Sequence, residues 1–222
     1  MESKRPVENL AFADSPLGPV IGPMVMCGVV IDQKDTSKLL EIGVKDSKLL
    51  TPKQRENLFE KIKKIAKSHE IIIISPEEID KTLESEDLNL NWLEALTSAK
   101  ILNKLKPDKA ILDCPSNNTK AYSDYVKKNL KANIDLIVEH KADLKYPVVG
   151  AASILAKVTR DREIEKIKKK IRINFGSGYP SDSTTVEFLK KYWNKYPDIF
   201  RKTWASYKKV AKLKGQTKIG EF

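Results

Sequence analysis

Short apolar runs alternate along this chain with stretches whose apolar residues recur at helical spacing. The segment LAFADSPLGPVIGPMVMCGVVID, residues 10–32, holds two apolar runs around a Pro- and Gly-rich loop, which predicts two strands paired as a hairpin. Further runs of strand length are EIIIIS (70–75), KAILDCP (109–115) and NIDLIVEH (133–140). The pattern therefore predicts a sheet whose later strands are separated by longer connections.

Stretches with helical spacing fill these connections and continue beyond the last predicted strand. Thr51 before Pro52, and Ser75 three residues before Glu78, are N-terminal capping signals for two of the helices. Helices are expected over residues 52–68, 75–83, 90–105, 118–130, 147–171, 183–195 and 200–213. This alternation is typical of an α/β fold with a mixed sheet, flanked by helices and followed by a helical C-terminal part.

The bulk composition narrows the class of protein. A chain of 222 residues with 41% hydrophobic and 32% charged residues is expected to fold in water as one domain, or as a domain with a short appendage. No apolar run approaches the roughly 20 residues that span a bilayer, and the N-terminus lacks the apolar region of a secretory signal. We therefore expect no membrane partner.

Cysteine and histidine usage bears on location and metal chemistry. Two cysteines form no disulfide framework, which favours a reducing compartment: the cytoplasm, or the nucleus if the source is eukaryotic. Two histidines leave little room for a His-based zinc site. A metal bound here would take oxygen ligands, which favours Mg²⁺ or Mn²⁺.

The formal net charge of +11 is the strongest bulk signal. Such a surface attracts polyanions, and nucleic acid is the commonest one inside cells. Two interpretations stay open, because the lysines are spread over several helices. They either converge on one nucleic-acid-binding face or only solvate several faces.

Four acids are expected at strand ends or in the loops between elements, where α/β proteins place their chemistry: Asp14, Asp46, Asp113 and Asp143. Carboxylates brought together without basic partners repel one another unless divalent cations neutralise them. Such clusters promote phosphodiester hydrolysis with two metal ions. The alternative is that each Asp is only a turn or cap residue, which Asp commonly is.

Four sequence blocks resemble ribonuclease HII, the type 2 RNase H of archaea and eukaryotes. They are KDSKLLT (45–51), ILDCPSNNTK (111–120), EHKADLKYPVVGAASILAKVTRD (139–161) and FGSGYPSD (175–182), within a resemblance that extends from residue 11 to residue 213. The resemblance implies an RNase H-like fold and a monomer that uses Mg²⁺ or Mn²⁺. It also implies endonucleolytic cleavage of the RNA strand of RNA–DNA hybrids and of ribonucleotides embedded in duplex DNA.

The resemblance also implies a domain organisation and roles for residues within these blocks. Residues 1–175 would form the RNase H-like domain, 176–213 a helical substrate-binding extension, and 214–222 a flexible tail. Asp113 and Asp143 match the third and fourth metal-binding acids of the family. Tyr179 matches a tyrosine that packs under the sugar beside the ribonucleotide and reports its 2′-hydroxyl. Lys48 matches a residue near the substrate backbone, and Asp46 is expected to order its loop.

The first motif of the family departs from its pattern in this chain. Residues 11–19 align with Gly-Ile/Val-Asp-Glu-Ala-Gly-Arg-Gly-Pro, so Ala13 stands where the family has its first metal-binding Asp. Asp14 replaces Glu and is the remaining candidate ligand. Pro16 and Leu17 replace the Gly and Arg of a loop that presents backbone groups to the ribose 2′-oxygen, while Gly18 is retained.

These changes leave two functional interpretations open. In the first interpretation, cleavage persists and the catalytic metal ligands are Asp14, Asp113 and Asp143. The substrate is then contacted by Gly18, Lys48 and Tyr179, together with the altered positions Pro16 and Leu17. In the second, the chain binds hybrids with impaired or no cleavage, because Ala13 has no oxygen to ligate a metal.

The C-terminal tail QTKIGEF resembles the box that binds the sliding clamp PCNA. Gln216, Ile219 and Phe222 stand at its spacing of Gln, aliphatic and aromatic anchors. The chain ends after one aromatic where the box usually has two. The alternative is a frayed tail with incidental apolar residues.

Several other residues have two interpretations each. His140 would lie near a metal site and assist product release, or would be an ordinary loop histidine. The three tryptophans are expected in the core and not as base-stacking platforms. Cys27 is expected to be a small buried hydrophobe, and Cys114, beside Asp113, has no evident partner that would lower its pKa.

Overall fold

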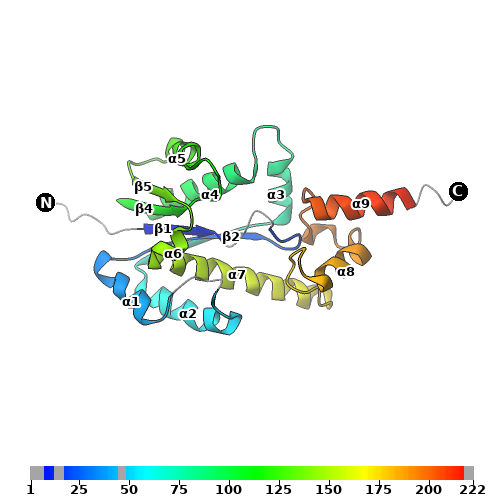
Figure 1. The fold of residues 1–222 in the computed structure, drawn as a ribbon, viewed down its shortest axis with the longest axis horizontal. Helices are drawn as coiled ribbons and strands as arrows, with labels where there is room; N and C mark the ends of the chain where they lie inside the picture. The colour runs from blue at the N-terminus through cyan, green and yellow to red at the C-terminus, as the bar shows by residue number, and fades with distance from the viewer. Residues whose placement is uncertain (1–7, 13–17, 45–48, 218–222) are drawn as a thin grey trace. The chain divides into compact units, whose positions relative to one another are not determined.

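The structure is a computed structural model that describes residues 8–12, 18–44 and 49–217, with side chains for 18–44 and 49–213. Its sheet has five strands in the order β3-β2-β1-β4-β5 (Figure 1). The strands are β1 (Glu8–Phe12), β2 (Met24–Val30), β3 (Ser68–Ile74), β4 (Lys109–Asp113) and β5 (Asp135–Glu139). β1 pairs antiparallel with β2 and parallel with β4, and β4 pairs parallel with β5. The predicted hairpin and mixed sheet are therefore confirmed.

The helices alternate with these strands and then dominate the C-terminal part. They are α1 (Thr36–Glu41), α2 (Pro52–Ile65), α3 (Pro76–Leu83), α4 (Leu90–Leu105), α5 (Thr119–Lys128), α6 (Ala142–Lys145), α7 (Pro147–Ile171), α8 (Ser183–Tyr192) and α9 (Ala205–Thr217). Two short 3₁₀ segments, η1 (Gln33–Asp35) and η3 (Pro197–Ile199), complete the list for the described residues. None of the helices in these ranges is long and apolar enough to span a membrane.

Both predicted N-terminal caps form. The Thr51 hydroxyl accepts the Gln54 N–H at the start of α2, and the Gln54 side chain accepts the Thr51 N–H. Ser75 and Glu78 make the same reciprocal pair at the start of α3. These contacts satisfy backbone donors that lack partners within the helix, which explains why the two helices begin where the sequence predicts.

The described chain divides into two compact units. The first consists of β1 and residues 25–73 and 90–159, and the second of residues 18–24, 74–89 and 160–217. The long helix α7 belongs to both, with the division at Arg160. The predicted boundary between residues 175 and 176 stays a prediction, because compactness alone does not define a domain.

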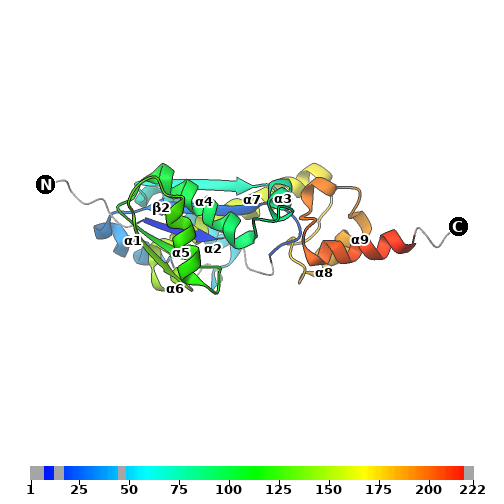
Figure 2. The same ribbon diagram turned by 90° about the horizontal axis from the view of Figure 1, so that it is seen from above.

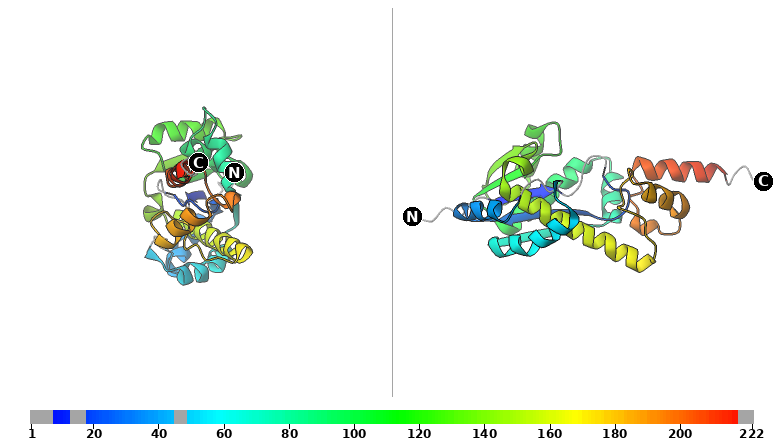
Figure 3. Two further views of the ribbon diagram at one scale, coloured as in Figure 1. Left: turned by 90° about the vertical axis from the view of Figure 1, so that its right-hand side faces the viewer. Right: turned by 60° about the horizontal axis from the view of Figure 1, so that its bottom comes forward.

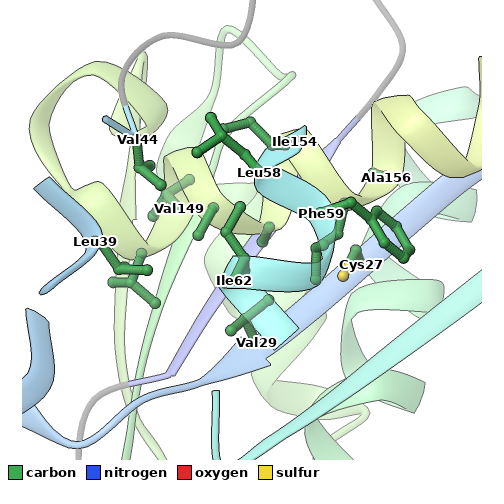
Figure 4. Packing of buried hydrophobic residues seen from close by; sticks show 14 of the residues in the cluster. Cys27, Val29, Leu39, Val44, Leu58, Phe59, Ile62, Val149, Ile154 and Ala156 are labelled. Carbon is green, nitrogen blue, oxygen red and sulfur yellow. The ribbon is translucent and has the colours of Figure 1, made fainter. Parts of the chain in front are cut away.

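In the first unit, helices cover both faces of the sheet (Figure 1). Helices α4 and α5 lie side by side on one face (Figure 2). The other face packs against α1, α2 and the first half of α7, where the main apolar core forms around Cys27, Leu58, Ile62 and Val149 (Figure 4). Cys27 is fully buried, and burial raises the pKa of its thiol far above the usual range, as expected of a structural cysteine.

The second unit has a separate apolar core. Phe188 of α8 is central to it, with ring centroids 5.4 Å from Phe175 and 6.0 Å from Phe200. Tyr207 of α9 packs on Phe200 at 5.5 Å and donates its hydroxyl to the Trp193 carbonyl. Helices α8 and α9 are in contact (Figure 3). The aromatic side chains of this core join them.

The prediction of a helix over residues 200–213 is wrong at its start. Residues 200–204 are not helical, and α9 begins at Ala205. The Arg201 N–H binds the Val20 carbonyl, while the Lys202 and Thr203 N–H groups bind the Asp80 carboxylate. These long-range bonds replace the first helical turn, and hydrophobic spacing could not reveal them. The short helices α1 and α6 were not predicted.

Candidate active site

The parallel strands of the first unit bring acids to one edge of the sheet. β1, β4 and β5 run in the same direction, so their carboxyl ends meet at the same edge. β4 ends at Asp113, which is in register with Glu139 at the end of β5. In the sequence, Ala13 and Asp14 directly follow Phe12, the last residue of β1. The topology thus brings the carboxyl ends of β1, β4 and β5 together, with Asp113 and Glu139 at this edge.

Asp113 and Asp143 are linked through the start of α6. The Asp113 Oδ1 accepts the backbone N–H of Ala142 at 3.0 Å, and Asp143 is the next residue. Lys141, at the N-cap position of α6, has φ +56° and supplies no side-chain cap. The Asp113 carboxylate therefore supplies the cap that the side chain of Lys141 does not. The helix that it caps carries Asp143, which is only 7% exposed.

The far end of α6 is also fixed to β5. Glu139 accepts hydrogen bonds from the Lys145 ammonium and from the Tyr146 hydroxyl, the latter at 3.2 Å. The bond from Lys145 is the main cause that lowers the pKa of Glu139. Because α6 is a single turn held at both ends, the backbone at Asp143 has little freedom.

His140 lies in the same region but contacts backbone. Its Nδ1 is 3.2 Å from the Cys114 carbonyl oxygen, and its side chain is exposed. The Cys114 N–H in turn binds the Glu139 carbonyl, so the two strand ends are joined twice. Burial raises the pKa of the Cys114 thiol, as expected without a partner that stabilises the thiolate. The described contact of His140 is thus with the backbone at the end of β4, and its role stays a prediction.

Two of the predicted metal ligands, Asp113 and Asp143, lie among the described residues. Asp113 and Asp143 offer the oxygen ligands that Mg²⁺ and Mn²⁺ prefer. Within the ranges that the structure describes, no group of three or more His, Cys, Asp or Glu side chains could hold a metal ion. Ala13, which has no ligating atom, and Asp14 lie outside the described residues. The donor set therefore fits a divalent cation only if Asp14 completes it.

Tyr179 belongs to the second unit, in a loop fixed by side chains. Asp182 accepts the Ser177 N–H at 2.7 Å and the Ser177 hydroxyl at 2.9 Å, which lowers the pKa of its carboxyl. The Thr185 hydroxyl accepts the Gly178 N–H and donates to the Phe175 carbonyl. These bonds fix the loop on both sides of Gly178, which leads directly into Tyr179.

A buried arginine holds the Tyr179 ring. The guanidinium carbon of Arg160 lies 4.7 Å from the ring centroid, within the range of a cation–π contact. Arg160 is 1% exposed and donates from Nη2 to the Ser177 carbonyl at 3.3 Å. The sequence contained Arg160 within a family block, but no local pattern marks an arginine as buried, so its contact with Tyr179 was missed.

Gly18, the retained glycine of the first motif, is buried in the second unit. Its carbonyl accepts the indole N–H of Trp204 at 3.1 Å. Two residues on, the N–H groups of Val20 and Ile21 bind the Gly178 carbonyl at 2.8 and 3.2 Å. The segment is thereby held between the residue before α9 and the Tyr179 loop. Trp204 was predicted only as a core residue, so this hydrogen bond was also missed.

The remaining predicted residues fall partly outside the described chain. Gln216 lies in the last turn of α9, and its side chain is not described. Trp92, Trp193 and Trp204 are all partly buried and pack on other aromatic or arginine side chains, in line with the core interpretation. Outside the described residues lie Asp14, Pro16, Leu17, Asp46, Lys48, Ile219 and Phe222.

Comparisons with known proteins agree over most of the chain. The sequence model of the family described as ribonuclease HII matches residues 17–207. The chain is 47% identical over 198 residues to ribonuclease HII of Pyrococcus furiosus, covering 87% of this chain and 86% of that protein. The family match begins at Leu17, the last altered residue of the first motif.

Solved structures show the same RNase H-like fold. The crystal structure of the ribonuclease H2 from Pyrococcus horikoshii OT3 is 44% identical, with a TM-score of 0.82, covering 93% of this chain and 98% of that chain. The structure of the PCNA:RNase HII complex from Archaeoglobus fulgidus has a TM-score of 0.80 at 38% identity, covering 93% of this chain and 96% of that chain. The predicted fold class is confirmed.

Proposed function

This chain belongs to the ribonuclease HII family, and we propose that it cleaves the RNA strand of RNA–DNA hybrids and single ribonucleotides embedded in duplex DNA. The observation that carries the proposal is the pair Asp113 and Asp143 at one sheet edge, joined through the Ala142 N–H. If Asp143 were only a turn residue, no second acid such as Asp113 would be needed to cap the helix α6 that carries it. The net charge of +11 suits a polyanionic substrate.

Asp113, Asp143 and Asp14 would hold the metal, Mg²⁺ or Mn²⁺. A bound divalent cation of this kind activates water and stabilises the leaving oxygen in phosphodiester hydrolysis. The chain's own contribution is placement. Asp113 accepts the Ala142 N–H through Oδ1, which directs its carboxylate toward the start of α6. Glu139 fixes the far end of α6, so Asp143 is held without reorganisation when a ligand arrives.

Recognition of the ribonucleotide would involve the second unit. Tyr179 would pack under the sugar, with its ring held by Arg160 and its backbone by the Gly178 loop. Gly18 would present backbone groups to the 2′-oxygen. Pro16, Leu17 and Lys48 occupy further positions that face substrate in the family pattern.

The experiment is cleavage of a duplex that contains one ribonucleotide, with Mg²⁺ and separately with Mn²⁺. It compares the unmodified chain with its Ala13→Asp and Asp113→Asn variants. Cleavage by the unmodified chain that is lost in Asp113→Asn would support the enzyme with Asp14 as a working ligand. Cleavage only in Ala13→Asp would show that the metal site lacks a single ligand.

A second function is favoured by Ala13. A chain that has lost the first metal ligand but keeps the substrate contacts would bind hybrids without turnover. A group that acts only at the reacting centre commonly contributes a factor of 10² to 10³ in rate or more. If the unmodified chain binds a ribonucleotide-containing duplex more tightly than plain DNA and releases no product with either metal, this second function is the correct one.

We also propose that the C-terminal tail docks on a sliding clamp through Gln216, Ile219 and Phe222. Two observations support this proposal. One is the spacing of the three residues, and the other is the similarity to a relative solved as a PCNA complex. Gln216 lies in the last turn of α9, which ends at Thr217. A chain that ends at Gly215 should lose clamp binding in a pull-down and retain duplex binding.

A further inference from the structure

We propose that Trp204 is a positioning residue for ribose recognition: its indole N–H holds the backbone of Gly18. The inference rests on the proposed function, because it assigns Gly18 to the sugar contact. It goes beyond that function because it assigns Trp204, the residue before α9, to fix the backbone conformation of the first family motif at Gly18. The hydrogen bond joins residues 186 positions apart.

The contact is directional and partly buried. The Trp204 Nε1 donates to the Gly18 carbonyl at 3.1 Å, Gly18 is buried, and the indole is partly buried. An indole N–H can only donate, so this carbonyl is its natural partner. Glycine lacks a side chain that would restrict its backbone. A fixed external donor therefore selects one orientation of the Gly18 peptide among several.

Trp204 is itself held from two directions. The Asp80 carboxylate of α3 accepts the Lys202 N–H at 2.8 Å, the Thr203 N–H at 2.9 Å and the Thr203 hydroxyl at 2.7 Å, which fixes the backbone directly before Trp204. The Arg201 guanidinium lies 4.9 Å from the indole ring and donates from Nε to the Gly22 carbonyl at 3.0 Å. Arg201 therefore contacts both the indole and the far end of the Gly18–Gly22 segment.

The same segment is bonded to the loop that carries Tyr179. The Gly178 carbonyl accepts the N–H groups of Val20 and Ile21. A Cβ at Gly178 would approach the Ile21 carbonyl oxygen to 3.0 Å, so this close approach requires glycine. The Val20–Ile21 backbone is therefore bonded directly to the peptide that precedes Tyr179. Trp204 binds the same segment at its other end, Gly18.

The chain offers a matched pair of substitutions. Trp204→Phe keeps an aromatic ring for Arg201 but deletes the N–H donor together with one ring of the indole. Trp193→Phe makes the same chemical change at another partly buried tryptophan of the same unit, and its indole N–H donates to no described residue. Phenylalanine at position 193 retains a ring near Tyr207. The pair thus separates the loss of the Gly18 bond from the general effect of replacing tryptophan.

The first measurement is amide hydrogen exchange over residues 18–22 in the full-length chain. We expect faster exchange in Trp204→Phe than in the unmodified chain or in Trp193→Phe, by about fivefold to tenfold, as follows from losing one hydrogen bond. If exchange in this segment is the same in all three proteins, Trp204 does not hold it and the inference is overturned.

The second measurement is the ratio of dissociation constants for a plain DNA duplex and the same duplex with one ribonucleotide, without divalent metal so that nothing is cleaved. We expect Trp204→Phe to lower this ratio by about fivefold, and Trp193→Phe to leave it unchanged. Binding of plain DNA should be equal in all three, because phosphate contacts are not altered.

The two measurements separate this inference from the proposed function. Faster exchange with an unchanged ratio would refute the role of Trp204 in ribose recognition while leaving the function intact. An unmodified chain that binds both duplexes equally would refute the proposed recognition of a ribonucleotide. In that case the proposed role of Trp204 in ribose recognition is refuted as well. The exchange data alone then decide whether Trp204 holds Gly18.

Discussion

The double use of Asp113 leads to a prediction that separates its structural role from its chemical one. Asp113 caps α6 through Oδ1 and is a proposed metal ligand. Asp113→Asn keeps a side-chain oxygen at the same position, whereas Asp113→Ala removes it. Both substitutions delete the same negative charge, so any repulsion between Asp113 and Asp143 is relieved equally in the two variants. Their difference in stability therefore isolates the cap.

The expected difference follows from the single hydrogen bond at 3.0 Å. Asn and Asp are comparable as capping residues, and replacement of either by Ala costs about 1 kcal/mol, within a range of roughly 0.5–2 kcal/mol. Ala142 is fully buried, which places the value in the upper half of that range, because its N–H has poor access to water. Asp113→Ala should thus be about 1–2 kcal/mol less stable than Asp113→Asn.

The assay is urea denaturation of both variants under one set of conditions, with amide exchange at Ala142 as a local probe. The Ala142 N–H should be protected in Asp113→Asn and should exchange faster in Asp113→Ala. Divalent-metal-dependent cleavage should be lost in both, measured in the Ala13→Asp background if the unmodified chain is inactive. Equal stability and equal exchange in the two variants would show that Asp113 does not cap α6.

Three further predictions concern the second unit and the tail. Gly178→Ala should destabilise the protein by about 2 kcal/mol in urea denaturation, because φ is +84° and the new Cβ would lie 3.0 Å from the Ile21 carbonyl oxygen. Hydrogen bonds from Ser177 lower the pKa of the Asp182 carboxyl in the folded protein. Its contribution to the free energy of unfolding is therefore complete above the unfolded pKa of 3.8 and is lost as the pH falls through the lower folded pKa. Asp182→Asn should weaken this dependence of stability on acid pH, measured by urea denaturation at several pH values. Deletion of residues 216–222 should abolish clamp binding, measured by pull-down, and leave the urea midpoint unchanged.

Elements with strong local signals were predicted well from the sequence. α7 and α4 begin and end where the pattern places them, and the caps of α2 and α3 are set by neighbouring residues. α6 is too short for a hydrophobic period, and its cap comes from a residue 29 positions earlier. Local patterns cannot predict an element whose stabilising partner is distant in the sequence.

The candidate site divides in the same way. The roles predicted for Asp113, Asp143 and Tyr179 come from motifs, which record residue types at fixed spacing, and they stay predictions. The residues that position them could not be assigned. Arg160 and Trp204 reveal their roles only through contacts with Tyr179 and Gly18, and these contacts depend on tertiary packing.

The backbone at Lys141 distinguishes the α6 segment from an unconstrained turn. A non-glycine residue at φ +56° is held in a sparsely populated conformation that costs about 1 kcal/mol or more. Such a conformation persists where the surroundings determine it, and here Asp113 fixes the N–H that follows Lys141 while Glu139 fixes the other end of α6. A simple turn between β5 and α7 would need neither contact. The strained backbone brings α6, which carries Asp143, to the end of β4. If the missing ligand at position 13 alone limits the reaction, Ala13→Asp should raise the cleavage rate without any second substitution.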